Sequence, residues 1–169
     1  MKDSVEIVHL SPQNWESYKQ LRLRAIEAEP QAFGKSYKDA SSEPDENWRK
    51  KLESTGSGKS WSVFAKVDGK LVGMLAATLH PQEPDRVWLH ATYVEKEYRR
   101  QGIAQNLMGT ILQEIAKSNA PKKIKLGVSK KQTAAVELYK KFGFKVIGEQ
   151  DYVMGNGEKV REFIMEKQL

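Results

Sequence analysis

Residues 94–104 have the types and spacing in this chain that best fit the binding of a charged ligand. They read Val-Glu-Lys-Glu-Tyr-Arg-Arg-Gln-Gly-Ile-Ala and lie between a predicted strand and a predicted helix. Gly102 lets the backbone pass close to a ligand, and the small Ala104 does the same further along. The free amides and the dipole of a helix N-terminus favour an anion such as a pyrophosphate, to which Arg99 and Arg100 add positive charge. The same residues also fit an ordinary strand–loop–helix junction with one glycine.

A second stretch, residues 132–144, carries a further pattern. It reads Gln-Thr-Ala-Ala-Val-Glu-Leu-Tyr-Lys-Lys-Phe-Gly-Phe. Together the two stretches resemble the signatures of the GNAT superfamily of acyl-CoA-dependent N-acyltransferases. These signatures are Arg/Gln-x-x-Gly-x-Gly/Ala after the fourth strand and Asn-x-x-Ala-x-x-Leu-Tyr-x-x-x-Gly-Phe. Residues 99–104 match the first in full, and the second departs only at Gln132, where the family has asparagine. That departure weakens the side-chain contact expected with the cofactor.

The resemblance implies an activity, a cofactor and a set of contacts. The activity is transfer of an acetyl group from acetyl-CoA to a primary amine in a ternary complex. The pantetheine arm would pair with the backbone near Tyr93 and Val94, and the pyrophosphate would lie on the amides of residues 100–104. The expected cofactor-binding residues are Tyr93, Val94, Arg99, Arg100, Gln101, Gly102, Ile103, Ala104, Gln132, Ala135 and Tyr139.

Attack of an amine on a thioester requires a proton acceptor for the amine and benefits from a proton donor for the thiolate. The resemblance places Tyr139 beside the sulfur as the acid, although a tyrosine on the apolar face of a helix also fits simple core packing. His90 is the predicted base, because strand 89–94 looks like that of arylalkylamine N-acetyltransferases and an imidazole has a suitable intrinsic pKa. A structural histidine, Glu95 or Glu97 acting through water, and a backbone carbonyl with a water relay are alternatives.

The acceptor pocket is the part that the sequence specifies least. By resemblance, the segment between the first two helices and the last hairpin wall it, which selects Phe33, Tyr37 and Trp88 as candidate substrate-binding residues. Tyr152 and Lys35 are further candidates, and each aromatic side chain also fits ordinary packing. Peptide or protein amines, polyamines, arylalkylamines and antibiotics all remain open as acceptors.

Hydrophobic periodicity and turn residues predict the elements that position these groups. The order is β-α-α-β-β-β-α-β-α-β-β, so the fold class is α+β, with a mixed, mostly antiparallel sheet flanked by helices. The strand–helix–strand unit around the helix 102–116 makes the fourth and fifth strands parallel, and resemblance to the GNAT fold adds a splay between them. Predicted strands cover 5–10, 61–67, 71–79, 86–94, 124–128, 145–153 and 159–165, and residues 30–37 are expected to form a loop.

Composition narrows the class of protein. The chain has 169 residues, which fit a single N-acetyltransferase domain spanning 1–169, and a net charge of +6. The absence of cysteine excludes disulfides and thiolate metal sites, and no metal site is predicted. Neither an apolar leader in Met1–Glu6 nor a membrane-length apolar run is present, so a cytoplasmic protein without a membrane partner is expected.

Other classes of function remain to be compared. Scattered lysines without a recognition motif disfavour a nucleic-acid partner. A homodimer through strand pairing is left open by similarity to related proteins. The alternative to an enzyme is a non-catalytic acyl-CoA-binding regulatory module on the same fold.

Overall fold

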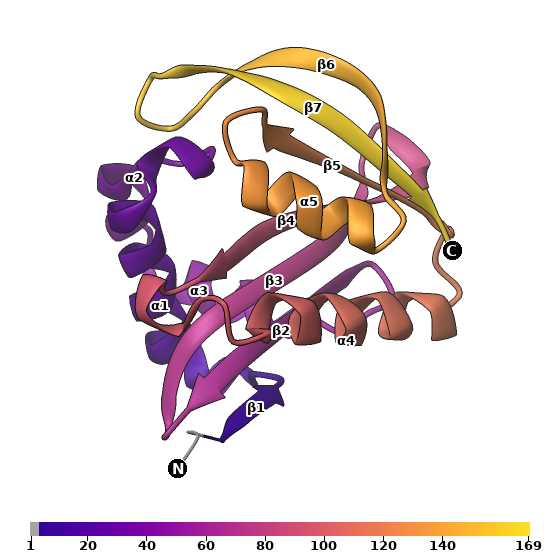
Figure 1. The fold of residues 1–169 in the computed structure, drawn as a ribbon. Coiled ribbons are helices and arrows are strands. Elements are labelled where there is room, and N and C mark those ends of the chain that lie inside the picture. The colour runs from indigo at the N-terminus through magenta and orange to yellow at the C-terminus, as the bar shows by residue number, and fades with distance from the viewer. Residues whose placement is uncertain (1–3) are drawn as a thin grey trace.

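The computed structural model describes residues 4–169. The first three residues, which belong to the predicted domain and to the N-terminal stretch expected to lack an apolar leader, lie outside the described residues. These residues form seven strands and five α-helices (Figure 1). Their order is the predicted one, except that one of the five helices, the short α2, was not predicted. The helices are α1 (Trp15–Ala28), α2 (Tyr37–Ser41), α3 (Asp45–Glu53), α4 (Ile103–Lys117) and α5 (Thr133–Lys141). The strands are β1 (Val5–Val8), β2 (Ser60–Val67), β3 (Lys70–His80), β4 (Glu83–Val94), β5 (Lys123–Ser129), β6 (Lys145–Val153) and β7 (Lys159–Gln168).

All seven strands form one sheet in the order β1-β2-β3-β4-β5-β7-β6. Every neighbouring pair is antiparallel except β4 and β5, which are parallel and pair over only three positions, at residues 86–88 and 123–125. β4 continues for six residues beyond that point and β5 for four, without pairing to each other. The predicted α+β class, the mixed sheet and the splay between the fourth and fifth strands are confirmed.

Turn chemistry explains the antiparallel half of the sheet. Asp68 and Gly69 link β2 to β3 with φ angles of 48° and 82°, which is the double positive φ that a two-residue type I′ hairpin requires. β4 is less regular, because its register against β3 shifts between Met74 and Ala76 where Ala91 has a φ of 56°. This β-bulge bends the strand and turns its last residues relative to the first ones.

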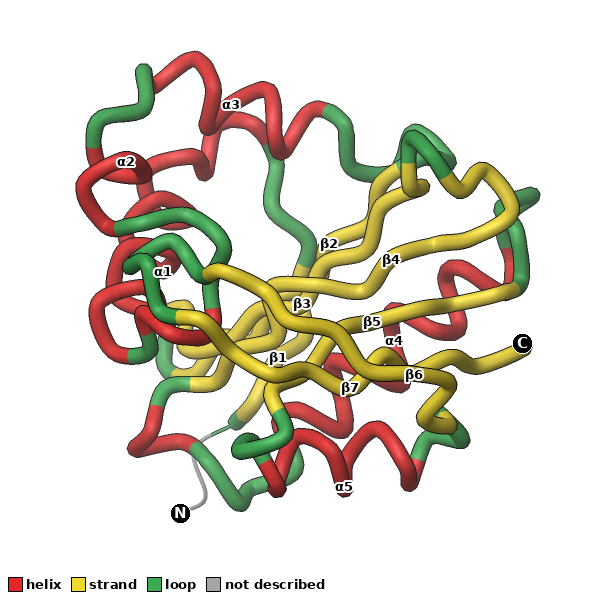
Figure 2. Tube along the Cα trace, turned by 90° about the horizontal axis from the view of Figure 1, so that it is seen from above, coloured by secondary structure: helices red, strands yellow, loops and turns green. Residues whose placement is uncertain are grey.

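Helices cover both faces of the sheet, and each face has its own apolar core (Figure 2). α4 packs across β1 to β4 with a continuous stripe of buried side chains, as its sequence periodicity predicts. The stripe consists of Ile103, Leu107, Met108, Ile111, Leu112 and Ile115. On the other face α1 and α3 enclose Trp48 and Phe64, and the ring of Tyr18 packs edge-on to both at 5.5 Å between centroids.

Several element boundaries differ from the sequence prediction, among them β1, which ends at Val8 and not at residue 10, and three further cases are larger. Residues 30–37, predicted as a loop, contain a 3-10 turn (Pro30–Ala32) and the start of α2, whose first amides are capped because Asp39 N donates to Ser36 Oγ at 3.1 Å. β4 begins at Glu83 and therefore includes Pro84, which the sequence prediction placed in a turn. β7 continues to Gln168 because β5 pairs with its residues 162–168.

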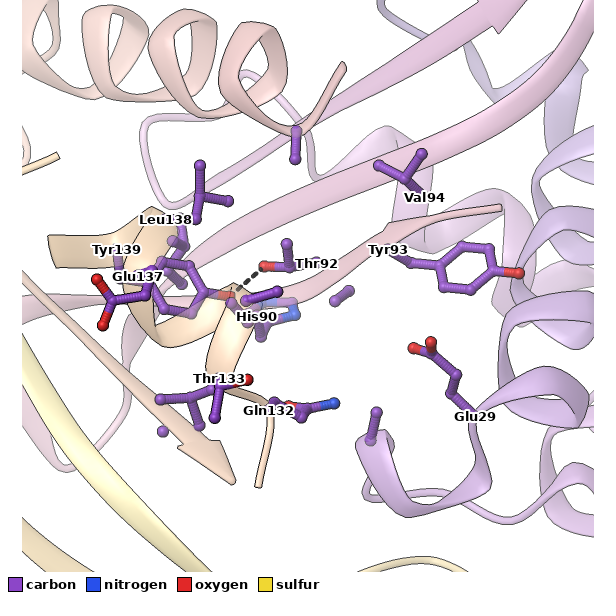
Figure 3. A pocket seen from close by; sticks show the side chains of 18 of the residues that line it. Glu29, His90, Thr92, Tyr93, Val94, Gln132, Thr133, Glu137, Leu138 and Tyr139 are labelled. Carbon is purple, nitrogen blue, oxygen red and sulfur yellow. Dashed lines mark hydrogen bonds between the residues drawn. The ribbon is translucent and has the colours of Figure 1, made fainter. Parts of the chain in front are cut away.

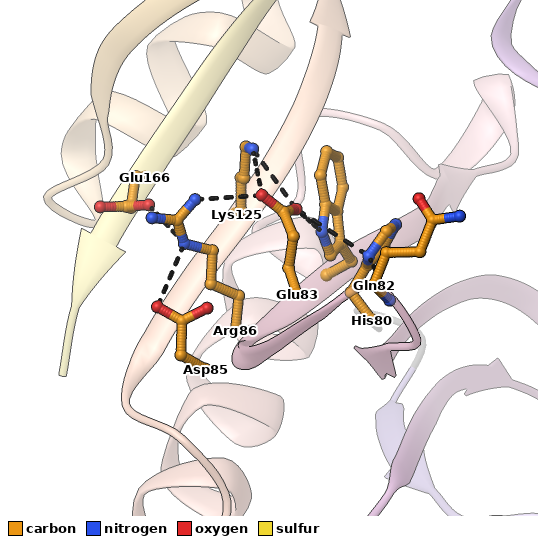
Figure 4. Close-up of polar contacts among 8 residues, drawn as sticks. His80, Gln82, Glu83, Asp85, Arg86, Lys125 and Glu166 are labelled. Atoms are coloured by element: carbon orange, nitrogen blue, oxygen red, sulfur yellow. Dashed lines mark hydrogen bonds and ion pairs between the residues drawn. The ribbon is translucent and has the colours of Figure 1, made fainter.

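A charged cluster holds the closed end of the splay together (Figure 4). Glu83 accepts hydrogen bonds from Arg86 at 3.2 Å, from Lys125 on β5 at 3.2 Å and from the indole of Trp88 at 3.0 Å. Arg86 lies 3.4 Å from Glu166 on β7. Burial alone would raise the pKa of Glu83, but the hydrogen bonds from Lys125 and Trp88 outweigh it and lower the pKa. Three strands are thus joined by one network where pairing begins.

The Glu83→Gln variant should therefore lose about 1 kcal/mol of unfolding free energy, since the amide still accepts from Trp88 but no longer balances Lys125 and Arg86. Urea denaturation measures this change, with Glu158→Gln at an exposed turn as the matched control. Equal stability of the two variants would contradict a structural role for the cluster.

No helix among residues 4–169 is long and apolar enough to cross a membrane.

Candidate active site

The splay opens into a cleft of about 870 Å³ that extends from the N-terminus of α4, past the end of β4, to the β6–β7 hairpin. Its size is within the range of small-molecule sites. Beyond residue 88 the edge of β4 that faces β5 has no strand partner, so the backbone groups along it, apart from the Val94 carbonyl that accepts from Arg99, are available to a ligand in the cleft. Figure 3 shows that the cleft lies between β4 and the start of α5.

The N-terminus of α4 forms an anion cradle at one end of the cleft. Arg100 and Gly102 have φ angles of 62° and 80°, which turn the loop sharply so that the chain enters the helix at Ile103. No side chain caps the helix, and its first turn has no acidic residue. Since the first amides of a helix lack intrahelical acceptors and lie at the positive end of its dipole, they can bind an anionic group. These residues fit the phosphates of a CoA-type molecule.

The two arginines that precede Gly102 differ in their roles. Arg99 donates from Nε to the carbonyl of Val94 at 2.8 Å and from Nη2 to Glu29 at 2.5 Å, so its side chain ties the loop to the end of α1. Its charge is therefore balanced within the protein, unlike the free charge that the sequence prediction assigned to it. Arg100 is exposed beside the cradle and lines the cleft.

Tyr139 lies in the middle of the cleft wall. α5 has one apolar face, which turns Val136 and Tyr139 inward, and the Tyr139 ring packs edge-on against Phe144 with centroids 5.9 Å apart. Its hydroxyl donates to Thr92 Oγ1 at 3.0 Å, the contact dashed in Figure 3. Burial raises the pKa of Tyr139, an effect that the hydrogen bond to Thr92 only partly offsets. The phenol is therefore protonated at neutral pH and can donate a proton.

His90 faces the cleft from the opposite face of β4 to Leu89, because side chains alternate along a strand and Leu89 is in the α4-side core. Its Nε2 lies 3.4 Å from Thr78 Oγ1. The residue is exposed to the cleft, whose walls limit its contact with bulk solvent. The resulting loss of solvation, with the charge of Arg22 as a second cause, lowers the pKa of His90 to about 4. The imidazole is neutral at neutral pH and can accept a hydrogen bond.

The carboxylates considered as alternative bases are in unsuitable places. Glu95 is buried and accepts hydrogen bonds from Arg24 at 2.7 Å and from Lys70 at 2.8 Å. Burial alone would raise the pKa of Glu95, but these two cations outweigh it and lower the pKa. Glu97 is exposed and is not part of the cleft lining. Neither carboxylate is available to a substrate.

Most of the residues predicted from the sequence meet in this cleft, and four do not. The predicted residues that line it are Trp88, His90, Tyr93, Val94, Arg99, Arg100, Gly102, Ile103, Ala104, Gln132, Ala135, Tyr139 and Tyr152. Phe33 is instead buried in the second core, edge-on to the Tyr93 ring at 6.4 Å and under the guanidinium of Arg22. Tyr37 is 47% exposed, and Gln101 lies outside the lining. Lys35 is paired with Glu43.

The sequence prediction missed the polar side chains that β6 and β7 bring to the cleft. Gln150 and Glu162 line it, and Gln150 Nε2 donates to Glu162 Oε2 at 3.1 Å. The hairpin between these strands closes over the α1–α2 segment, where Gly155 N donates to the carbonyl of Phe33 at 3.0 Å. Glu162 directly follows Arg161 in β7, and no local signal in the sequence distinguishes it from the exposed charged residues of that strand.

Comparison with known proteins assigns the family. The model of the acetyltransferase (GNAT) family matches residues 21–144, so the chain belongs to that family. A probable spermine N(1)-acetyltransferase of Bacillus subtilis subsp. natto is 33% identical over 98 residues, which cover 55% of this chain and 62% of that protein. The match thus spans less than two thirds of that relative's length.

Two further similarities extend over most of the chain. An L-amino acid N-acetyltransferase of Escherichia coli is 26% identical over 146 residues, covering 85% of this chain and 88% of that one. The structure of a putative acetyltransferase from Salmonella typhimurium with its cofactor acetyl-CoA has a TM-score of 0.80 at 14% identity. That superposition covers 98% of this chain and 94% of the other. At this identity the structural likeness establishes the fold.

Proposed function

We propose that residues 1–169 form a single N-acetyltransferase domain that moves an acetyl group from acetyl-CoA to a primary amine by direct attack in a ternary complex. The observation that carries this proposal is that one cleft contains both the uncapped N-terminus of α4 and the hydroxyl of Tyr139. The first can hold phosphates, and the second can protonate a leaving thiolate. Relatives named as spermine and L-amino acid acetyltransferases support an amine acceptor.

Acetyl-CoA supplies an activated thioester, and the protein positions it. The amides of residues 100–104 and the side chain of Arg100 bind the phosphates. The free edge of β4 at Tyr93 and Val94 pairs with the amide-containing arm, with Gln132 and Ala135 facing it from the start of α5. The Tyr93 ring points away from the cleft (Figure 3) and packs in the second core.

Proton movement involves the two titratable groups at the centre of the cleft. The amine must be neutral to attack, and its acidity increases as the C–N bond forms, so a weak base suffices at that stage. His90, which is neutral because of its lowered pKa, accepts this proton. Tyr139 is held by Thr92 with its proton in place and donates it to the sulfur as the thiolate departs.

Thermal unfolding with and without acetyl-CoA tests the cofactor assignment, with ATP as the control ligand. A ligand that binds only the folded state raises the unfolding midpoint. Release of free thiol is then measured with spermidine, an L-amino acid and an arylalkylamine as acceptors. We expect a rise with acetyl-CoA and amine-dependent thiol release. A thermal shift without turnover would support the non-catalytic acyl-CoA-binding module instead, and no shift at saturation would refute the cofactor site.

The anion cradle is tested by two isosteric variants at Gly102. Asn and Asp both tolerate the positive φ of this position, so the variants differ in charge alone. Gly102→Asp should weaken acetyl-CoA binding at least about tenfold more than Gly102→Asn, because the added carboxylate opposes the phosphates at close range. Isothermal titration calorimetry measures both affinities, and equal losses would place the phosphates elsewhere.

Tyr139→Phe removes the proton donor while keeping the ring that packs on Phe144. Turnover should fall by about a hundredfold or more, the range of general acid catalysis, with acetyl-CoA affinity nearly unchanged. Thr92→Val is the companion variant, since it deletes the hydrogen bond and retains the phenol. Steady-state rates and cofactor titration distinguish the two effects. Unaltered turnover in Tyr139→Phe would exclude the residue as the acid.

The protonation of His90 should determine the pH below which activity falls. Because its pKa is lowered to about 4, the imidazole stays neutral down to that pH and is protonated below it. We therefore expect kcat/KM to have an acidic limb near pH 4 from His90, and His90→Ala to lose this limb together with most of the activity. Initial rates after brief exposure to each pH record the profile. An identical limb in His90→Ala would mean that another group is the base.

A further inference from the structure

Glu162 is a buried carboxylate with an unusual position in the cleft. It lies on β7 with 7% of its surface exposed, and it is part of the lining. Pairing of β5 with β7 aligns Glu162 with Ser129, so it projects from the same face as Gly127, opposite to the side chains of the α4-side core. This is also the face of His90 on β4. The carboxylate therefore lies across the splay from the catalytic histidine.

The hydrogen bonds of Glu162 do not neutralise its charge. Among the described residues 4–169, the one side-chain donor to it is Gln150 Nε2, a neutral amide. No lysine, arginine or histidine of residues 4–169 forms an ion pair with it. The neighbouring carboxylates differ, because Glu29 is paired with Arg99 and Glu149 with Lys130 and Arg161. A buried carboxylate without a cationic partner is costly unless a ligand supplies the charge.

Gly127 provides the space for this carboxylate. A Cβ at this position would lie 2.8 Å from Glu162 Oε2 and 3.3 Å from the carboxyl carbon. The absence of a side chain on β5 therefore lets the carboxylate lie over the strand and reach the cleft. The β6–β7 hairpin closes above it, since Gly155 is bonded to the α1–α2 segment and the Tyr152 hydroxyl lies against Gly34. The carboxylate is thus in a covered compartment on the acceptor side.

We propose that Glu162 binds a second ammonium group of the acceptor, one that is not acetylated, so that the enzyme prefers diamines and polyamines. The reacting amine is a poor partner for this carboxylate, because an ion pair would stabilise its protonated form and oppose attack. A carboxylate on the acceptor would be repelled, which disfavours amino acids as substrates. This assignment rests on the proposed function and specifies its substrate class.

Three acceptors with the same five-carbon chain measure how much the second charge of the acceptor contributes to kcat/KM. Cadaverine, n-pentylamine and δ-aminovalerate each present the same primary amine, and the far end carries an ammonium, a methyl or a carboxylate. In the wild-type protein kcat/KM should decrease in that order. Glu162→Gln, which keeps the shape and the contact with Gln150, should lower kcat/KM for cadaverine about ten- to hundredfold, the value of a charged hydrogen-bonded contact. It should leave n-pentylamine nearly unchanged and improve δ-aminovalerate.

Two companion variants control for structure. Gly127→Ala keeps the carboxylate but displaces it, so it should reduce the preference for cadaverine over n-pentylamine as Glu162→Gln does. Glu149→Gln removes the same charge from the exposed side of β6 and should leave the preference unchanged. Thermal melting of each variant confirms that it is folded.

Calorimetric binding of cadaverine to the CoA-saturated protein gives a readout that does not require turnover. Weaker binding to Glu162→Gln supports the subsite even if no acetyl transfer occurs, in which case only the proposed function fails. Equal loss of kcat/KM for all three acceptors, or equal cadaverine binding by wild type and Glu162→Gln, would overturn the assignment.

Discussion

The structure depends on the short parallel pairing between β4 and β5. Three residue pairs and the charged network around Glu83 join the strands at one end, and beyond that point they separate. Every group in the cleft is located relative to this separation. The free edge of β4 exists because β5 leaves it. α4 and α5 start where the separated strands end, so their first turns face the same opening. A fully paired sheet would have buried the backbone groups that a ligand needs.

The bulge in β4 changes which side chains of this strand face the cleft. With Ala91 at positive φ, the strand changes its register against β3 and presents His90 to one face, while Thr92 meets Tyr139 from α5. The proposed acid and the proposed base therefore approach the cleft from different elements. Their protonation states are set by their surroundings, because burial holds the proton on Tyr139 and loss of solvation keeps it off His90. This division fits a reaction in which one proton leaves the amine and another reaches the sulfur.

The two ends of the cleft also differ in charge. At the α4 end, helix amides and Arg100 provide positive potential for phosphates. At the β6–β7 end, Glu162 provides an uncompensated negative charge under the closing hairpin. The ion pair of Arg99 with Glu29 joins the loop to the end of α1 and has no net charge. The cluster of Arg24 and Lys70 with Glu95 lies outside the cleft lining. The net charge of +6 does not predict this separation of charge along the cleft, which depends on where the fold places each charged group.

Local sequence determined the parts of this protein that need only neighbouring residues. The order of elements, the Asp68–Gly69 hairpin and the apolar stripe of α4 follow from periodicity and turn chemistry. The glycine before the helix start at Ile103 is likewise a local feature of the stretch 99–104, although these residues alone also fit an ordinary strand–loop–helix junction. The inward position of Tyr139 also follows from helical spacing.

Tertiary structure decided the remainder. The pairing of Glu95 with Arg24 and Lys70, and of Arg99 with Glu29, joins residues that are distant along the chain. The burial of Phe33 and the low pKa of His90 likewise depend on what surrounds them. Glu162 is the clearest case, since the sequence of β7 does not reveal which of its charged residues is covered. Its place over Gly127 follows from β5–β7 pairing, and solvation and charge partners are properties of the assembled sheet that no local pattern contains.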